Sequence, residues 1–355
     1  MPEQTEEQQI SHYANLILHS FKDKFHITDT MDVYVTISMG ISLYPKHGKD
    51  EDSLIKSANR AMYASKRFEK NAYRIYDSEL ERVHKKSRQI ENALKEVNMD
   101  EEFEVHFQPK MDIKTNEIRG FEALVRWNHP ELGNIPPNEF IKIAEETGNI
   151  WKIDEWVLRE ACKTVQTWNR RRKGKPFYIG VNISANHFAH PDFLPHVQSV
   201  LEKTGLDANL LEIEITETTL ITNPEETKNN IQRLREIGVT VSIDDFGTGY
   251  TSLNYIRNYT FDTIKIDRSY IREMIEKKED WIIVKTIINL AHELKIKVVA
   301  EWVEDEQVLQ VLKELNCDEI QGYLISKPLS KGNLENSLNV WRKNNKCSKK
   351  QKRGS

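Results

Sequence analysis

The sequence predicts an α/β fold, namely a (β/α)8 TIM-like barrel of about 245 residues that follows a small, partial α+β segment. Two observations indicate this fold. Eight short apolar strand candidates follow one another from residue 102 onward, and segments with helical periodicity separate most of them. An open doubly wound sheet is the alternative. It should carry a glycine-rich turn after its first strand, and the sequence has no such turn there.

The eight strand candidates are short and rich in branched apolar residues. Three helices between or after them have a clear apolar face, over residues 151–171, 268–294 and 304–315. The expected strands are Phe103–Pro109, Ile118–Leu124, Phe177–Ile183, Leu210–Ile215, Val239–Ile243, Thr263–Ile266, Lys295–Ala300 and Glu319–Tyr323.

The residues before the barrel predict a smaller unit and a connection. Residues 1–77 form the partial segment, with helices over 12–25 and 50–68 and strands over 32–44 and 72–76. Residues 78–99 predict one linker helix. Its apolar stripe packs on its own chain or pairs with a second copy, and the sequence favours neither, although we expect a homodimer. The barrel then spans 100–345, and residues 346–355 are a basic tail that we interpret as solvated.

Composition excludes several classes of protein. The chain has 355 residues, of which 38% are hydrophobic and 30% charged, and no apolar run is long enough to cross a membrane. Its net charge of −4 gives no general field for a nucleic-acid polymer. Three scattered cysteines exclude a disulfide framework, and the acidic N-terminus is not a secretory signal. We therefore expect a cytoplasmic protein without membrane contact from this segment. Tethering through preceding domains stays open.

Polar residues stand at or near the ends of the predicted strands, where an apolar run would be expected to continue. In a parallel barrel these ends converge on one face, which is where such barrels place their chemistry. A single acidic residue after a strand is usually a helix cap or a solvated loop residue, but that interpretation does not explain the repetition. The residues are Glu122, Asn182, Glu214, Glu217, Asp244, Asp245, Lys265, Glu301 and Gln321.

A face with this many carboxylates requires positive charge. Oxygen ligands with one amide favour Mg2+ or Mn2+, and the adjacent pair Asp244 and Asp245 suits a bridge between two ions. Two ions held about 3.5–4 Å apart are the usual means of hydrolysing phosphate esters. Lys265 supplies a charge that suits a water or a phosphate. The loop over residues 246–249 is a simple turn or a mobile loop over the metals.

An ordered set of motifs then resembles a known family. Residues from about 102 to 340 resemble the EAL-domain cyclic-di-GMP phosphodiesterases. The motifs, in order, are FQPK (107–110), EALVRW (122–127), GVNIS (180–184), EIEITET (212–218), IDDFGTGYTSL (243–253), DTIKID (262–267), AEWVE (300–304) and QGYLISKP (321–328). The resemblance implies a barrel that hydrolyses cyclic-di-GMP to linear 5′-pGpG with two divalent ions.

The resemblance also implies roles for individual residues. Glu122, Asn182, Glu214 and Asp244 match ligands of the first ion, with Asp244 as the bridge. Asp245 matches a residue that serves the second ion. Glu301 matches either the general base or a ligand of that ion. Lys265 matches the lysine that holds the catalytic water, Gln321 supports it, and Glu217 matches the anchor of the loop after the fifth strand. Arg126 matches a phosphate-binding arginine, and Gln108, Leu124 and Asp154 match residues near the substrate.

Two departures qualify the resemblance. Trp302 replaces the glycine of the usual AEG pattern, so the indole either alters access to the site or points into a loop without effect, and we prefer the second interpretation. Residues 1–77 resemble the C-terminal half of a GGDEF diguanylate cyclase domain but lack its signature loop, so no cyclase site is expected. Half a sheet leaves an unpaired edge.

The leading hypothesis is therefore a metal-dependent cyclic-di-GMP phosphodiesterase. The alternative is a catalytically silent cyclic-di-GMP receptor, and a third interpretation is an unrelated metal-dependent barrel hydrolase.

Overall fold

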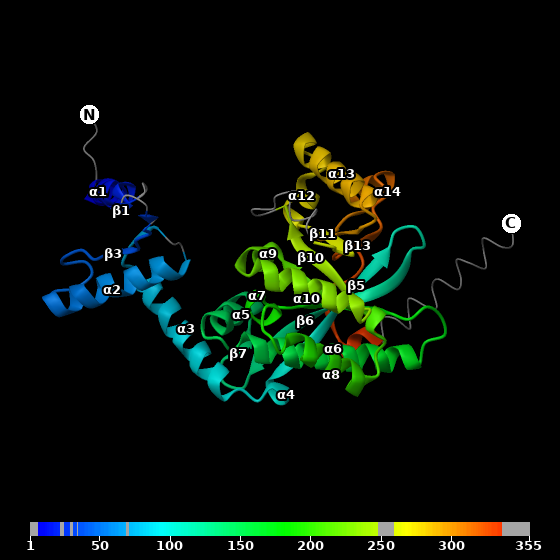
Figure 1. Cartoon of the computed structure of the whole chain (residues 1–355). Coiled ribbons are helices and arrows are strands. Elements are labelled where there is room, and N and C mark those ends of the chain that lie inside the picture. Colours follow the sequence, from blue (N-terminus) through cyan, green and yellow to red (C-terminus); the bar gives the residue numbers. More distant parts are fainter. Residues whose placement is uncertain are drawn as a thin grey trace. The chain divides into compact units, whose positions relative to one another are not determined.

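The computed structural model describes residues 6–21, 25–28, 31–33, 35–68, 71–247 and 259–335 (Figure 1). Contacts divide the chain into two compact units, Met1–Lys95 and Glu96–Ser355. None of the described helices is both long and apolar enough to cross a membrane.

The second unit is a closed barrel, and all eight predicted strands are present in it. Their order around the barrel follows their order in the chain, and pairing between the first two of them closes it. The strands are β5 (Phe103–Asp112), β6 (Glu117–His129), β8 (Tyr178–Asn182), β9 (Leu211–Thr216), β10 (Thr240–Phe246), β11 (Thr263–Ile266), β12 (Lys297–Ala300) and β13 (Glu319–Gln321). The fold class predicted from the sequence is confirmed.

One strand corrects the expectation of an all-parallel barrel. β5 runs antiparallel to both of its neighbours, β6 and β13, while the other seven strands are parallel. The cause is local. Only residues 113–116 separate β5 from β6, and a parallel connection needs a dozen residues or more. Within this hairpin, Asp112 accepts hydrogen bonds from the backbone and side chain of Thr115. Residues from the middle of β5, rather than from its C-terminal end, therefore line the wall of the site.

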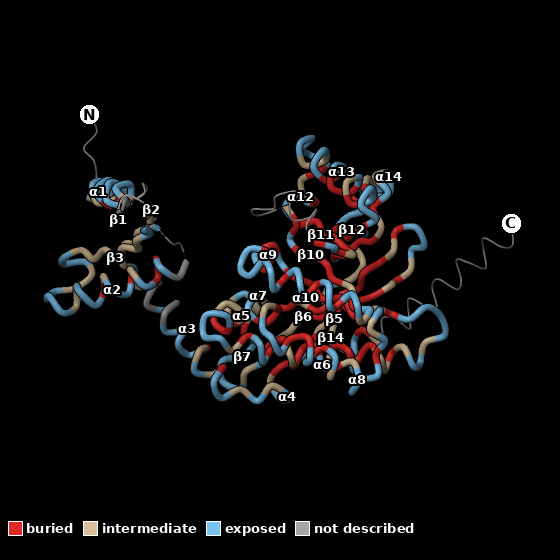
Figure 2. Tube along the Cα trace, in the orientation of Figure 1, coloured by how far each residue is buried: buried red, intermediate tan, exposed pale blue. Residues whose placement is uncertain are grey.

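Helices cover the outside of the barrel, and their inner faces are buried (Figure 2). The helix predicted over 151–171 is α6 (Ile150–Arg170), and the one over 304–315 is α14 (Glu306–Glu314), capped by Asp305. The helix predicted over 268–294 is wrong as a single element. It divides into α12 (Arg268–Glu273) and α13 (Lys278–Glu293), because Lys277 between them has an extended backbone.

Several shorter elements complete this unit. Two small strands, β7 (Gly133–Ile135) and β14 (Leu329–Ser330), extend the sheet beside β6 and β5. The other helices in the described part of this unit are α4 (Met99–Glu102), α5 (Pro137–Glu146), α7 (Ala185–Phe188), α8 (Phe193–Thr204), η1 (Ala208–Leu210), α9 (Glu217–Thr222) and α10 (Pro224–Glu236).

The first unit differs from the prediction in three places: the helix expected over 12–25 lies at Glu6–Ser20, the strand Phe25–Thr28 is not predicted, and the strand expected over 32–44 is broken. The expected strand over 32–44 is broken into β2 (Met31–Val33) and β3 (Met39–Ile41). β3 lies so close to α2 (Glu51–Phe68) that a Cβ on Gly40 would come within 1.9 Å of the Ala58 carbonyl oxygen. In the described residues, β1 pairs with β2 and β3 pairs with β4 as separate two-stranded sheets. The elements are α1 (Glu6–Ser20), β1 (Phe25–Thr28), β2 (Met31–Val33), β3 (Met39–Ile41), α2 (Glu51–Phe68) and β4 (Tyr73–Ile75).

The linker helix is α3 (Ser78–Glu96). Ile90 and Leu94 of its apolar stripe are buried within this single chain, which favours packing on the chain itself for that end of the stripe. The side chains of Leu80 and Val83 lie outside the described residues, as does the basic tail over 346–355. The homodimer and the domain boundaries at residues 77, 99 and 345 stay predictions.

Candidate active site

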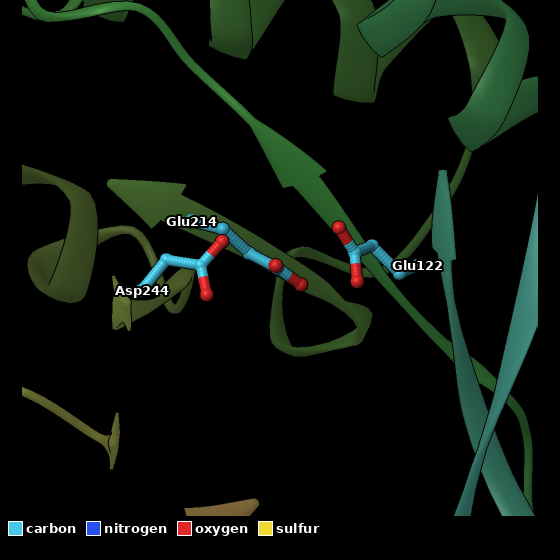
Figure 3. Close-up of side chains that lie close together, drawn as sticks. All are labelled: Glu122, Glu214 and Asp244. Carbon is cyan, nitrogen blue, oxygen red and sulfur yellow. The ribbon is translucent and has the colours of Figure 1, made fainter. Parts of the chain in front are cut away.

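The polar residues at the strand ends gather at one mouth of the barrel. Glu122 on β6, Glu214 on β9 and Asp244 on β10 point their carboxylates toward one another (Figure 3). The register of the strands explains the convergence. Asn182 of β8 pairs with Glu214 of β9, and Glu122 lies on β6, the other neighbour of β8. Lys265 on β11, Glu301 directly after β12 and Gln321 on β13 continue the ring.

Lys265 is the centre of this ring. Its side chain is fully buried, and its Nζ lies 2.5 Å from Glu214, 2.8 Å from Glu301, 3.0 Å from Asp244 and 3.4 Å from Glu122. Burial alone would lower the pKa of this ammonium group, but the four carboxylates outweigh burial and raise it well above its usual value. Lys265 is therefore charged, and its ammonium group contacts four carboxylates, one of which, Glu214, also contacts Lys110.

The carboxylates respond to burial in different ways. Burial raises the pKa of Glu301 well above its usual value and also raises that of Glu122, because Lys265 compensates each only in part. Glu214 differs, since two lysines reach it. Their charges and hydrogen bonds outweigh burial and hold its pKa at about 2.

Amide side chains orient Glu122. Asn182 Nδ2 donates to Glu122 Oε1 at 2.7 Å, and Gln321 Nε2 donates to Glu122 Oε2 at 2.5 Å. The same Gln321 nitrogen donates to Gln108 Oε1 at 3.0 Å. Gln108 faces Glu122 across the antiparallel pair of β5 and β6, so the reversed direction of β5 places it at this wall.

Two groups of carboxylates have the spacing of metal ligands. Ligand atoms of Glu122, Glu214 and Asp244 lie within 4.8 Å of one another, and so do those of Asp244, Asp245 and Glu301. Asp244 belongs to both groups, as the bridge between two ions must. An all-oxygen donor set suits Mg2+ or Mn2+, so the residues present fit the metals that the sequence predicts.

A bulge in β10 allows two adjacent aspartates to serve one site. In a regular strand Asp244 and Asp245 would point to opposite faces. Here β10 carries one extra residue against β11 between Ile243 and Phe246, and Asp245 has a φ of 53°. Bulges of this kind redirect a side chain. Burial and the neighbouring Asp244 and Asp267 raise the pKa of Asp245 to about 6.

Glu217 anchors the segment that follows β10. Its Oε1 accepts a hydrogen bond from the Gly247 backbone N–H at 2.7 Å, and the Gly247 carbonyl accepts one from Tyr270 Oη at 2.6 Å. Gly247 has a φ of 99°, which glycine adopts most readily. The prediction that this loop closes over the metals concerns residues 248–249, which lie outside the described residues.

A cavity of about 240 Å³ opens onto the carboxylates. Three of the four residues predicted to contact substrate line it, namely Gln108, Leu124 and Arg126. The fourth, Asp154 on α6, is not among the lining residues. Its Oδ2 accepts hydrogen bonds from the backbone N–H and the hydroxyl of Ser184, and lies 3.2 Å from His187 Nδ1. Asp154 thus fastens the loop after β8.

Comparison with protein-family models decides the identity of this barrel. The model described as "EAL domain" matches residues 88–328, which is more than half of the chain. The chain belongs to the EAL domain family. A second model, described as "Diguanylate cyclase, GGDEF domain", matches residues 1–72. Both resemblances found in the sequence are confirmed.

Curated relatives and solved structures agree with this assignment. Cyclic di-GMP phosphodiesterase NbdA of Pseudomonas aeruginosa is 37% identical over 334 residues, which cover 93% of this chain and 42% of the relative. Cyclic di-GMP phosphodiesterase PdeR of Escherichia coli is 33% identical over 316 residues, covering 89% and 47%. A structure titled "PaMucR Phosphodiesterase, c-di-GMP complex" is 36% identical with a TM-score of 0.66, covering 69% of this chain and 99% of that one. The chain spans less than half the length of these two curated relatives.

The EAL barrel contains a second buried lysine that the sequence motifs did not single out. Lys110 on β5 is fully buried one layer below the mouth, and its Nζ lies 2.9 Å from Glu212 and 2.6 Å from Glu214. Tyr178 donates to Glu319 in the same layer, and Thr263 donates to Glu212 at 2.8 Å. Charged residues inside apolar strands, as in FQPK and EIEIT, are the sequence signal for this layer.

Gly180 is required by this arrangement. A Cβ there would lie 1.8 Å from Glu214 Oε1 and 2.9 Å from Lys110 Nζ. The glycine of the GVNIS motif thus leaves room for the carboxylate that joins the two layers.

Two interpretations of Trp302 are open: the indole alters access to the site, or it points into a loop without effect. Trp302 lines the cavity together with Glu122, Asp244 and Glu301, and its ring lies beside that of Tyr323 in the segment after β13, so whether it affects the site stays a prediction. Its φ is 54°, a conformation that favours glycine, which explains physically why an EAL domain with glycine here is unstrained.

Proposed function

We propose that this protein is a cyclic-di-GMP phosphodiesterase that uses two divalent ions, Mg2+ or Mn2+, to release linear 5′-pGpG. Membership of the EAL family supports the substrate, since two curated relatives carry that activity in their names and a solved neighbour is a c-di-GMP complex. The chain covers only part of those relatives, so the activity is proposed for the barrel described above.

One observation carries the proposal. The ammonium group of Lys265 faces four buried carboxylates, of which only Glu214 also contacts Lys110 among the described residues, and Asp244 is shared by two groups with metal-ligand spacing. Uncompensated charges in a barrel interior cost several kcal/mol each, on the order of the stability of a domain. Divalent cations would neutralise them and would at the same time supply the chemistry.

Different residues of the chain would then hold each of the two ions. Glu122, Asn182, Glu214 and Asp244 would hold one ion, and Asp244, Asp245 and Glu301 the other. When bound, the ions would polarise the phosphate and lower the pKa of a coordinated water. Asn182 and Gln321 fix the orientation of Glu122.

The reaction itself needs one water. Its oxygen joins a phosphorus of the ring, the P–O3′ bond breaks, and the 3′ oxygen leaves with a proton. Glu301, whose pKa burial raises, is suited either to take the proton of the water or to serve as a ligand. Lys265 would hold the water, while Arg126 at the cavity wall would bind a phosphate oxygen.

Hydrolysis of cyclic-di-GMP tests this proposal. The protein is incubated with the dinucleotide and Mn2+ or Mg2+, or with a chelator, and the products are separated by chromatography. We expect pGpG with either metal and none with the chelator. Binding without product in excess Mn2+ would contradict the enzymatic proposal and support the silent receptor, in which case Trp302→Gly should restore some turnover.

A further inference from the structure

Trp302 occupies a backbone position that disfavours any side chain. Its φ of 54° lies in the left-handed region, where a Cβ crowds the following carbonyl oxygen. The indole is also 44% exposed, so burial of its apolar surface is incomplete. A strained, half-exposed tryptophan beside a cluster of carboxylates requires an explanation other than core packing.

Neighbouring backbone holds this residue in place. The Val303 N–H donates to the Gln321 carbonyl at 3.1 Å, and the Leu324 N–H donates to the Val303 carbonyl at 3.0 Å. Gly322 allows this close approach, because a Cβ there would lie 2.2 Å from the Val303 carbonyl oxygen. The loops after β12 and β13 are therefore held together by backbone hydrogen bonds at Val303, the residue that follows Trp302.

The indole belongs to a row of aromatic and cationic side chains. The guanidinium carbon of Arg268 lies 4.9 Å from the centre of the Trp302 ring. The ring centres of Trp302 and Tyr323 are 5.9 Å apart with an interplanar angle of 33°, and Lys327 Nζ lies 5.3 Å from the centre of the Tyr323 ring. We call these four residues the aromatic–cation row. Arg268 is the first residue of α12, Trp302 lies in the loop after β12, and Tyr323 and Lys327 lie in the segment after β13.

The row meets the proposed site at the cavity wall. Trp302 and Tyr323 line the same cavity as Glu122, Asp244 and Glu301, and Tyr323 is 46% exposed. Exposed ring surface next to positive charge suits a ligand that carries both a flat heteroaromatic ring and a phosphate. Divalent cations ligated by the carboxylates of the site would bind a phosphate of that same ligand.

We infer that Trp302 is a base-recognition residue, on which a guanine base of the nucleotide stacks while Arg268 holds the indole in place. This inference rests on the proposed function, because it assumes a nucleotide phosphate at the carboxylates. It goes beyond that function because it assigns Trp302, which replaces the glycine of the AEG pattern, a role in affinity for the base. The alternative role of the ring is to fasten the two loops without touching ligand.

Two ligands that differ only in the base separate these roles. Guanosine 5′-monophosphate and ribose 5-phosphate are titrated by calorimetry into the full chain with Mg2+ present. The variants are Trp302→Gly and Trp302→Phe, with Trp281→Leu as the matched control. Trp281 lies on the outer helix α13 with Lys285 Nζ 4.9 Å from its ring centre, and it does not line the cavity. Glycine suits the backbone at position 302, so that variant should fold.

We expect Trp302→Gly to raise the dissociation constant for guanosine 5′-monophosphate about tenfold, which is within the range for one base stacked on an aromatic ring. Trp302→Phe should retain most of the affinity. Binding of ribose 5-phosphate should not change in either variant, and Trp281→Leu should match the wild type for both ligands.

Three results would overturn the inference: unchanged affinity for guanosine 5′-monophosphate in Trp302→Gly, an equal loss for both ligands, or no binding of the nucleotide to the wild type. Hydrolysis of cyclic-di-GMP by the wild type is measured in parallel. Selective loss of base binding without any hydrolysis contradicts the proposed function alone, whereas intact hydrolysis with unchanged base binding contradicts this inference alone.

Discussion

Two buried lysines lie in adjacent layers of the same barrel, and they differ in how many carboxylates surround each of them. Lys110, the deeper one, has two carboxylates within 2.9 Å, and its Nζ also lies 5.4 Å from the centre of the Tyr178 ring. Lys265, at the mouth, has four carboxylates within 3.4 Å. Both ammonium groups are fully buried, so burial does not distinguish them.

The difference is in how the negative charge is satisfied. In the deeper layer, the hydroxyl group of Thr263 donates to Glu212, which Lys110 also contacts, and the hydroxyl group of Tyr178 donates to Glu319. At the mouth, amide groups donate to Glu122 and two lysines to Glu214, but among the described residues Asp244 and Glu301 receive positive charge from the shared Lys265. The deeper layer is complete within the protein, whereas the mouth has a surplus of negative charge that divalent cations would remove.

The largest expected effect concerns the carboxylates at the mouth. Glu122→Ala removes a ligand of the first ion and should lower the hydrolysis of cyclic-di-GMP by about three orders of magnitude, because metal-assisted charge stabilisation is worth several kcal/mol. Glu104→Ala is the matched control, since Glu104 lies on the adjacent strand β5 with its side chain 48% exposed. Undiminished hydrolysis in Glu122→Ala would exclude this cluster as the site.

The two lysines predict different responses to metal. Lys110→Met and Lys265→Met should each lower the free energy of unfolding by about 3–5 kcal/mol without metal, because each leaves buried carboxylates unpaired. Mn2+ should return most of the loss in Lys265→Met and little of it in Lys110→Met. Denaturant titration followed by tryptophan fluorescence reports this unit alone, since every tryptophan lies after residue 126.

Lys163→Met, at an exposed lysine on α6, should match the wild type in that titration. Equal recovery of both buried-lysine variants by Mn2+ would remove the distinction between the two layers.

The smallest effect concerns pH and the deeper layer. Burial raises the pKa of Glu319 above its usual 4.5, so the folded state favours the protonated carboxyl. A raised carboxyl pKa gives stability that is present below about pH 4.5 and is lost as pH rises through the folded value. Glu319→Gln should therefore gain stability relative to the wild type as pH rises, by about 1 kcal/mol. Denaturant titrations at several pH values check this, and a difference that shrinks with rising pH would contradict it.

The strands of this fold are readable from the sequence because each is an apolar run bounded by polar residues. All eight predicted strands are present, and Thr263–Ile266 has the predicted bounds. The direction of β5 differs from the prediction although its signal is present, because the short connection at 113–116 rules out a parallel crossover. The break between α12 and α13 is hidden in the sequence because helical periodicity continues across Lys277.

The sequence predicts the residues of the site about as well as it predicts the strands, and the reason is physical. Carboxylates that end parallel strands must converge, so strand order alone places Glu122, Glu214 and Asp244 together. The bulge that redirects Asp245 depends on pairing between β10 and β11, which the sequence does not encode locally. Lys110 faces inward only because of the register of β5, and Asp154 is fastened to Ser184 by a contact between distant elements.

The central claim is that the surplus of carboxylates around Lys265 holds divalent cations, and titration of metal-free protein with Mn2+ tests it most directly. Calorimetry should give two ions per chain for the wild type. Asp244→Asn should lose both, because Asp244 belongs to both ligand groups. Asp318→Asn is the control, since Asp318 lies away from the mouth beside His292. Unchanged Mn2+ binding in Asp244→Asn, or no binding by the wild type, would contradict the claim.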